Sequence, residues 1–166
     1  MKTAKRFYAL LLAVLMTVSL LPVSSLAKEI SVPMRGETVV GWEFESTNVA
    51  STANANNTGA AVTRESTDIA FSYSAGISGQ ALSSSYWDGA SEAAPKYYTA
   101  TVNATGYENL TVSASFRSSG TGPKNIKLYY SVDGENFIAV DGASVALASG
   151  TFGALTGTLP EDADGA

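Results

Sequence analysis

The feature that most constrains the fold of this sequence is an alternating segment that runs into a tight turn. Every second residue from 126 to 132 is bulky and apolar, which is the period of a strand with one buried face. The pair Asp133-Gly134 follows and favours a tight hairpin turn, because these residues tolerate positive φ angles. We therefore expect a β-hairpin whose second strand covers residues 136–140. A Gly/Pro-rich loop over residues 118–123 should precede it.

Similar patterns predict short strands along most of the chain. The other expected strands cover residues 37–45, 68–75, 80–87, 96–104, 110–117, 143–148 and 152–159. Residues 46–64 are rich in Asn, Ala and Thr and are expected to form a long loop that buries little. Turn signals recur at intervals of roughly ten residues, which is typical of an all-β sandwich or jelly roll. We predict this fold class, with about eight or nine short antiparallel strands.

The N-terminal residues have the composition of a targeting segment. Three basic residues precede an almost unbroken apolar run over residues 7–23, and the small residues Ser25 and Ala27 follow. This order is typical of a secretory signal peptide over residues 1–27, cleaved after Ala27. The alternative is an uncleaved membrane anchor, because the apolar run approaches spanning length. Pro22 and the Ser25-x-Ala27 spacing favour cleavage and therefore a secreted or cell-surface protein.

Removal of the signal peptide leaves 139 of the 166 residues, enough for one domain with its own core. Residues 28–36 are expected to be a linker, residues 37–160 the β-sandwich module, and residues 161–166 an unstructured acidic tail. We expect the tail to be the point at which further domains of a longer polypeptide would follow. No segment after residue 27 is apolar enough to cross a membrane.

Charge and composition exclude several kinds of function. Three of the ten basic residues belong to the signal peptide, so the remainder carries seven basic and fifteen acidic side chains, a net charge of −8. Such a surface repels nucleic-acid phosphates, and no direct nucleic-acid partner is expected. The chain has no Cys and no His. This excludes disulfides, His-dependent catalytic triads and ordinary zinc sites.

A series of short motifs resembles one family of bacterial modules. In chain order these are residues 42–45 (WEFE), 79–84 (GQALSS) with Trp87, 106–110 (GYENL), 118–123 (SSGTGP) and 130–134 (YSVDG). Together they resemble the N-terminal β-sandwich of large secreted bacterial nucleases, 5′-nucleotidases and related surface proteins, and the resemblance covers residues 38 to about 160. It implies a galactose-binding-like jelly roll whose catalytic domains lie downstream. The chain departs from the family after Leu159, where members continue into a closing aromatic strand with an Arg.

Aromatic residues around the 88–95 loop form the first candidate ligand site. Trp87 precedes this loop, Asp88 is its first residue, and Tyr97 and Tyr98 follow it. An aromatic platform beside a carboxylate suits the apolar face and the hydroxyl groups of a sugar. The alternative is that Trp87 and one of the two tyrosines belong to the core, because alternation places one residue of each pair inside.

Two basic residues flank the glycine-rich loop. Arg117 and Lys124 stand at its two ends, where they could hold an anion against exposed backbone amides. The loop lacks the lysine spacing of a phosphate-binding loop and no helix follows it, so a nucleotide site is not expected. The alternative is a turn that sets the shape of the chain and carries solvated charges.

Acidic residues supply two further candidates. Asp133, Gly134 and Asn136 offer oxygen ligands on a turn, as in calcium loops, but without the regular acidic series of such loops. Turn geometry explains them without a metal, and no cofactor is expected. Glu43 and Glu45 share one strand face, yet that face is the solvated one, so a carboxylate pair for glycoside hydrolysis is not indicated.

These observations favour a non-catalytic extracellular accessory module. Its expected partners are a carbohydrate or cell-wall polymer and the downstream domains of the same polypeptide, where it would also act as a spacer. The alternatives are part of a secreted phosphoesterase or nuclease, a small hydrolase that uses carboxylates alone, and an assembly subunit that pairs through an open strand edge.

Overall fold

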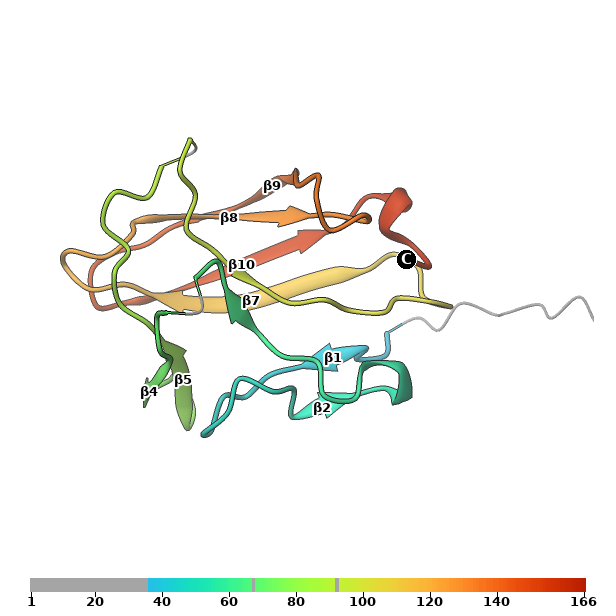
Figure 1. Ribbon diagram of the computed structural model, residues 1–166, viewed down its shortest axis with the longest axis horizontal. Coiled ribbons are helices and arrows are strands. Elements are labelled where there is room, and N and C mark those ends of the chain that lie inside the picture. Colours follow the sequence, from blue (N-terminus) through green and yellow to red (C-terminus); the bar gives the residue numbers. More distant parts are fainter. Residues whose placement is uncertain (1–35, 67, 92) are drawn as a thin grey trace, which may run out of the picture. The chain divides into compact units, whose positions relative to one another are not determined.

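In the part of the chain that the structure describes, the secondary structure consists of short antiparallel strands and two single 3₁₀ turns (Figure 1). The computed structural model describes residues 36–66, 68–91 and 93–166. The strands are β1 (Val40–Gly41), β2 (Thr52–Ala53), β3 (Thr63–Arg64), β4 (Ser72–Ala75), β5 (Gln80–Ser83), β6 (Tyr98–Thr99), β7 (Thr111–Arg117), β8 (Asn125–Tyr130), β9 (Ile138–Ala146) and β10 (Phe152–Thr158). They form two-stranded antiparallel sheets. The predicted β-rich fold is confirmed.

The predicted hairpin is formed by β8 and β9. Its turn contains Gly134 at φ +77°, and Tyr130 is paired with Ile138 across it. The strand expected over residues 143–148 is not separate, because β9 continues to Ala146. The register between β8 and β9 shifts between Lys127, which is paired with Ser144, and Tyr129, which is paired with Ala139. Gly142 lies in the part of β9 opposite this shift and adopts φ +71°.

The second long pair joins β7 to β10, with Arg117 opposite Phe152 and Thr111 opposite Thr158. The glycines that interrupt β10 allow β9 to pack closely against it. A Cβ atom added to Gly157 would lie 2.6 Å from the Ala143 Cβ atom, well inside van der Waals contact. The β8–β9 pair and the β7–β10 pair thus share one close contact surface.

A small hydrophobic core lies between these two pairs. Its buried residues are Val140, Ala143 and Leu155. Partly buried side chains from β7, β8 and β9 and from the residue that follows β10 pack around them: Phe116, Ile126, Leu128, Tyr130, Val145 and Leu159. The alternating pattern of β7 and β8 therefore directs one face of each strand to this core.

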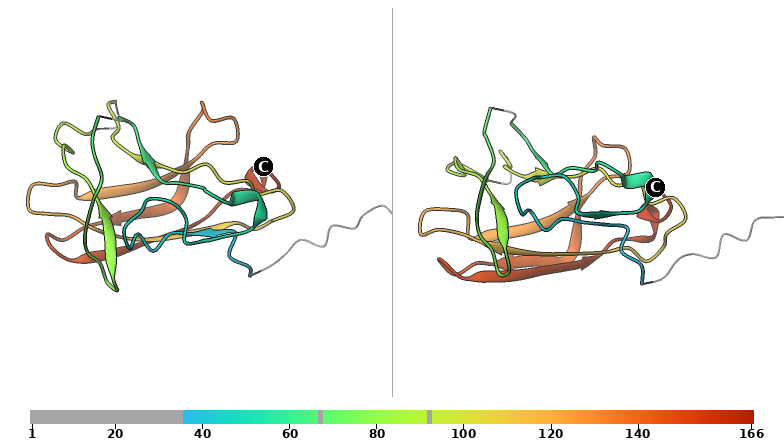
Figure 2. Two further views of the ribbon diagram at one scale, coloured as in Figure 1. Left: turned by 60° about the horizontal axis from the view of Figure 1, so that its bottom comes forward. Right: turned by 90° about the horizontal axis from the view of Figure 1, so that it is seen from below.

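The remaining pairs, β1–β2, β3–β6 and β4–β5, are shorter, and β4–β5 runs across the direction of the long strands (Figure 2). The strand expected over residues 37–45 is reduced to β1, since Phe44 adopts φ 57° and ends the extended backbone. The strands expected over residues 68–75, 80–87 and 96–104 are likewise shortened.

The expectation that residues 46–64 form a loop that buries little is wrong. This segment contains β2, the 3₁₀ turn η2 (Ala55–Asn57) and β3. Asn57 is buried, and its amide nitrogen donates to the Asn103 carbonyl (2.9 Å) while its amide oxygen accepts from the Asn103 N–H (2.7 Å). Polar residues can be buried here because they supply hydrogen bonds to a second segment.

The expectation of an unstructured tail over residues 161–166 is also wrong. The 3₁₀ turn η3 (Glu161–Ala163) opens this segment, and the Tyr130 hydroxyl donates to the Asp162 carboxylate at 2.9 Å. The Gly165 N–H donates to the Tyr107 carbonyl at 3.0 Å, and the Ala104 N–H donates to the Ala166 carbonyl at 2.6 Å. These hydrogen bonds hold residues 161–166 in a defined conformation, although their polar composition suggested an unstructured tail.

The predicted signal peptide and all but the last residue of the predicted linker lie outside the described residues. Within the part of the chain that the structure describes, no helix has the length and apolar character that a membrane span requires.

Candidate functional site

A buried arginine organises the region that contains the predicted aromatic site. Arg64 ends β3, and its side chain is 1% exposed. Its guanidinium donates to the Ser84 hydroxyl at 3.0 Å, to the Ser85 carbonyl, and to the Tyr86 carbonyl at 3.1 Å. Its Nε donates to the Glu65 carboxylate at 3.1 Å. These acceptors compensate the loss of hydration that burial of a guanidinium involves.

Two of the predicted ligand residues, Trp87 and Tyr98, pack around this guanidinium. The Arg64 Cζ atom lies 4.0 Å from the centre of the Trp87 ring system, a cation–π contact. Trp87 and Tyr98 meet edge to face with centroids 5.0 Å apart, and both are hydrogen-bonded to Ser84. Because Arg64 covers one face of Trp87, that face is not open to a sugar. The core alternative describes Trp87 and Tyr98 better than a platform does.

The environment of this cluster shifts two pKa values. Burial alone raises the pKa of Glu65, but hydrogen bonds from Arg64 and from backbone amides outweigh burial and lower it. Burial raises the pKa of Tyr98, against the smaller lowering effects of its Ser84 hydrogen bond and the nearby Arg64 charge. The Glu65 carboxylate is therefore ionised and Tyr98 is neutral at physiological pH.

Asp88 joins the cluster through its backbone. The Lys96 ammonium donates to the carbonyls of Tyr86 and Asp88, both at 2.6 Å, and so closes the loop between them. Tyr86 adopts φ 63°, which is unusual for a bulky residue, and its side chain is 71% exposed. The strained residue turns its carbonyl inward, toward Arg64 and Lys96.

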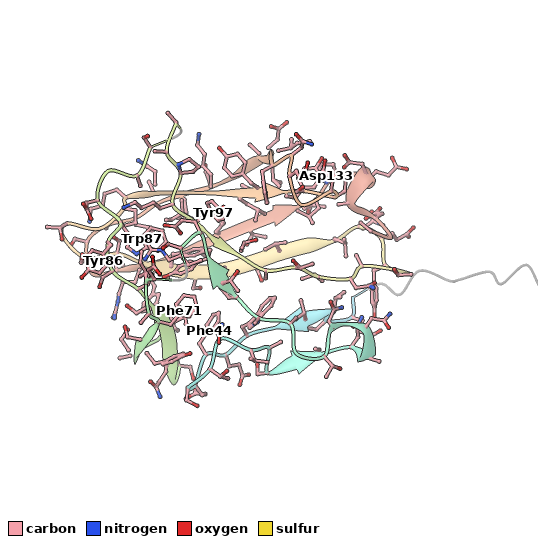
Figure 3. All side chains as sticks on the ribbon, in the orientation of Figure 1. Phe44, Phe71, Tyr86, Trp87, Tyr97 and Asp133 are labelled. Carbon is pink, nitrogen blue, oxygen red and sulfur yellow. The ribbon has the colours of Figure 1, made fainter. Side chains whose placement is uncertain are left out.

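Of the three aromatic residues in the predicted site, Tyr97 is the one that is exposed. Its backbone N–H donates to the Glu65 carboxylate at 3.2 Å, which ties it to the arginine cluster. Tyr97 is 43% exposed and Phe137 is 52% exposed. Their rings lie 6.4 Å apart, centre to centre, with an angle of 35° between the planes. We call these two residues the Tyr97–Phe137 pair. Figure 3 shows Tyr97 with the labelled residues Tyr86 and Trp87.

Arg117 and Lys124 are not part of this cluster's hydrogen-bond network in the described residues. The Arg117 guanidinium lies over the Phe152 ring, 4.9 Å from its centre, and the Lys124 ammonium donates to the Ser119 carbonyl. The Gly122 amide donates back to Ser119. The glycine-rich loop thus uses these groups to hold its own shape, as the turn alternative describes.

The Asp133 carboxylate accepts hydrogen bonds from residues of its own turn. One oxygen accepts from the Ser131 hydroxyl (2.8 Å) and from the amides of Glu135 (2.9 Å) and Asn136 (2.7 Å), and the other accepts from the Asn136 side chain (2.6 Å). Hydrogen bonds from Asn136, Glu135 and Ser131 hold the pKa of Asp133 well below its ordinary value. Among the described residues, no group of three acidic side chains could hold a metal ion together.

The sequence did not reveal Arg64, Glu65 or Phe137 as members of the site. Arg64 and Glu65 end a polar segment that resembles a loop, and Phe137 stands beside a turn. The only available signal was an arginine next to a glutamate in a chain with few basic residues. Comparison of the chain with protein-family models, curated proteins and solved structures finds no match.

Proposed function

We propose that this chain is a non-catalytic, exported β-sandwich module that binds carbohydrate through the Tyr97–Phe137 pair. The observation that carries the proposal is the pairing of two exposed aromatic rings from segments forty residues apart. Large aromatic side chains normally contribute to a core, so exposed paired rings indicate a binding surface. Such rings stack on the apolar faces of sugars, and the tyrosine hydroxyl adds a polar contact.

The rigidity of the surrounding structure supports this role. The Tyr97 backbone is held by Glu65, and Glu65 is held by Arg64. Arg64 is held in turn by the Ser84 hydroxyl and by the carbonyls of Ser85 and Tyr86. A binding surface fixed in this way loses little conformational entropy when a ligand arrives. Trp87 and Tyr98 belong to this support, and Tyr97 belongs to the surface.

The core between the β8–β9 and β7–β10 pairs supports the sandwich assignment. The motif series of the resembling bacterial modules agrees with an accessory role beside a downstream catalytic domain. The basic head and apolar run of residues 1–27 support export. The solvated and self-satisfied carboxylates favour binding over hydrolysis as the function of this chain.

The first test is co-sedimentation of the purified protein with a panel of insoluble polysaccharides, followed by affinity measurement on those that bind. Tyr97→Ala and Phe137→Ala should each weaken binding about tenfold, which corresponds to ~1.4 kcal/mol. Ile77→Ala is the matched control, because Ile77 is an equally apolar, 69% exposed residue in the β4–β5 turn. Absence of binding to every polysaccharide, or equal binding by all three variants, would refute the proposal.

A further inference from the structure

The Tyr97–Phe137 pair lies in an acidic setting. Phe137 follows directly on the turn that carries Asp133 and Glu135, and the segment 131–141 contains three acidic residues and no basic one. On the other side, the Glu65 carboxylate accepts a hydrogen bond from the Tyr97 backbone. The uncompensated acidic residues beside the aromatic pair are thus those of the 131–141 segment, because the Glu65 carboxylate is paired with Arg64.

The cations near this surface are already engaged. Lys96 precedes Tyr97, but its ammonium is bound to the carbonyls of Tyr86 and Asp88. Arg64 is buried and paired with Glu65. Lys127 lies farther along β8, opposite Ser144. The carbonyl hydrogen bonds do not neutralise the charge of Lys96, but the three carboxylates of the 131–141 segment outnumber it, so we expect a net negative field at the aromatic pair.

The charge of the turn persists over a wide pH range. Four hydrogen bonds from Ser131, Glu135 and Asn136 stabilise the ionised Asp133 carboxylate. Glu135 adds an exposed carboxylate two residues before Phe137. Phe137 thus follows two carboxylates closely in the chain: Asp133, which its hydrogen bonds hold in place, and the exposed Glu135.

We infer that the ligand of this surface is a polymer of amino sugars with free, protonated amines. This inference rests on the proposed function and names its ligand class. An ammonium group is attracted both by the faces of aromatic rings and by the surrounding carboxylates. The same carboxylates repel uronic-acid and sulfated glycans, so the surface selects against anionic polymers as well as for cationic ones.

The decisive comparison uses a free-amine and an N-acetylated form of the same glucosamine backbone, with an acidic polymer as a third ligand. Binding to soluble chitosan, whose amines are free, is compared with binding to a matched N-acetylated glucosamine oligomer, which is neutral, and to alginate, which is acidic. We expect chitosan to bind at least tenfold more tightly than the acetylated oligomer, and alginate not to bind. Raising the salt concentration should weaken chitosan binding, because the charges are exposed.

Charge variants locate the effect on this surface. Glu135→Gln should weaken chitosan binding ~3–5-fold, the range expected for an exposed ion pair, and leave binding of the acetylated oligomer unchanged. Glu43→Gln is the matched control, since Glu43 is an exposed carboxylate that follows β1.

The outcomes separate this inference from the function on which it rests. Equal binding of the acetylated and free-amine polymers, with loss in Tyr97→Ala, would overturn the inference and leave carbohydrate binding intact. Equal effects of Glu135→Gln and Glu43→Gln would also overturn it. Absence of all polysaccharide binding would overturn the proposed function itself.

Discussion

Arg64 shows how a single residue can connect segments that are distant in the chain. Burial of a guanidinium carries a desolvation cost of several kcal/mol. Acceptors from Glu65 and from residues 84–86 offset this cost, and the Trp87 ring covers the flat face. The arginine thereby attaches β3 to the segment that follows β5.

Replacement of Arg64 by Met should lower the free energy of unfolding by ~3–5 kcal/mol, because it leaves buried acceptors and the Glu65 charge without their partner. Arg117→Met is the matched control. Arg117 is exposed and also lies over an aromatic ring, so its loss should cost less than ~1 kcal/mol. Urea unfolding measures both values, and similar losses in the two variants would contradict a central role of Arg64.

Asp133 links the stability of the hairpin turn to pH. Its folded-state pKa is lowered below the ordinary value of 3.8, so ionised Asp133 stabilises the fold at every pH above that value. The contribution is lost as pH falls toward the folded-state pKa. Asp133→Asn should therefore be less stable than wild type at pH 7, and the difference should narrow below pH 3.8. A difference that is constant from pH 7 to pH 2 in thermal unfolding would refute this.

At the scale of elements, the glycines of β10 determine how closely two strand pairs approach. A Cβ atom on Gly157 would meet the Ala143 Cβ at 2.6 Å and the Leu128 side chain at 3.0 Å. Both neighbours belong to the packed core region, where little relaxation is available.

Gly157→Ala should therefore destabilise the protein by ~1–3 kcal/mol through overpacking, despite the higher strand propensity of alanine. Gly120→Ala is the control, because a Cβ atom there would meet only the Ser149 hydroxyl at 3.8 Å. Differential scanning calorimetry should show a lower Tm for the first variant and little change for the second. An unchanged Tm in Gly157→Ala would show that the β9–β10 contact is looser than described.

The elements that could be predicted from the sequence are those with a buried face of their own. In β7 and β8 the alternation of apolar side chains determines the strand, because half of each strand must leave water. The sequence of β10, which is interrupted by glycines and rich in Thr, gave a weaker strand signal. The shorter strands β1 and β6 were predicted too long. Their ends depend on the backbone of Phe44 and on pairing with distant segments, which local pattern does not contain.

At the scale of the whole described chain, contacts between distant segments define the candidate site. The alternation of Tyr97 and Tyr98 predicted that one ring would be inside and one outside, and it gave no means to tell which. Nor could the sequence reveal that Phe137 would meet Tyr97, or that Arg64 would meet Trp87. Such pairings depend on how separate hairpins pack, and this is decided by the core.

The pairing of β7 with β10 also has a consequence for how the protein forms. β7 ends at Arg117 and its partner begins at Phe152, with the complete β8–β9 hairpin between them. As the chain is synthesised from its N-terminus, the hairpin can close at once, while β7 must wait with an unpaired edge and an exposed apolar stripe. We therefore expect closure of β10 onto β7 to be a late, slow step of folding, and the interval before it to be the one in which the nascent chain is most exposed to aggregation.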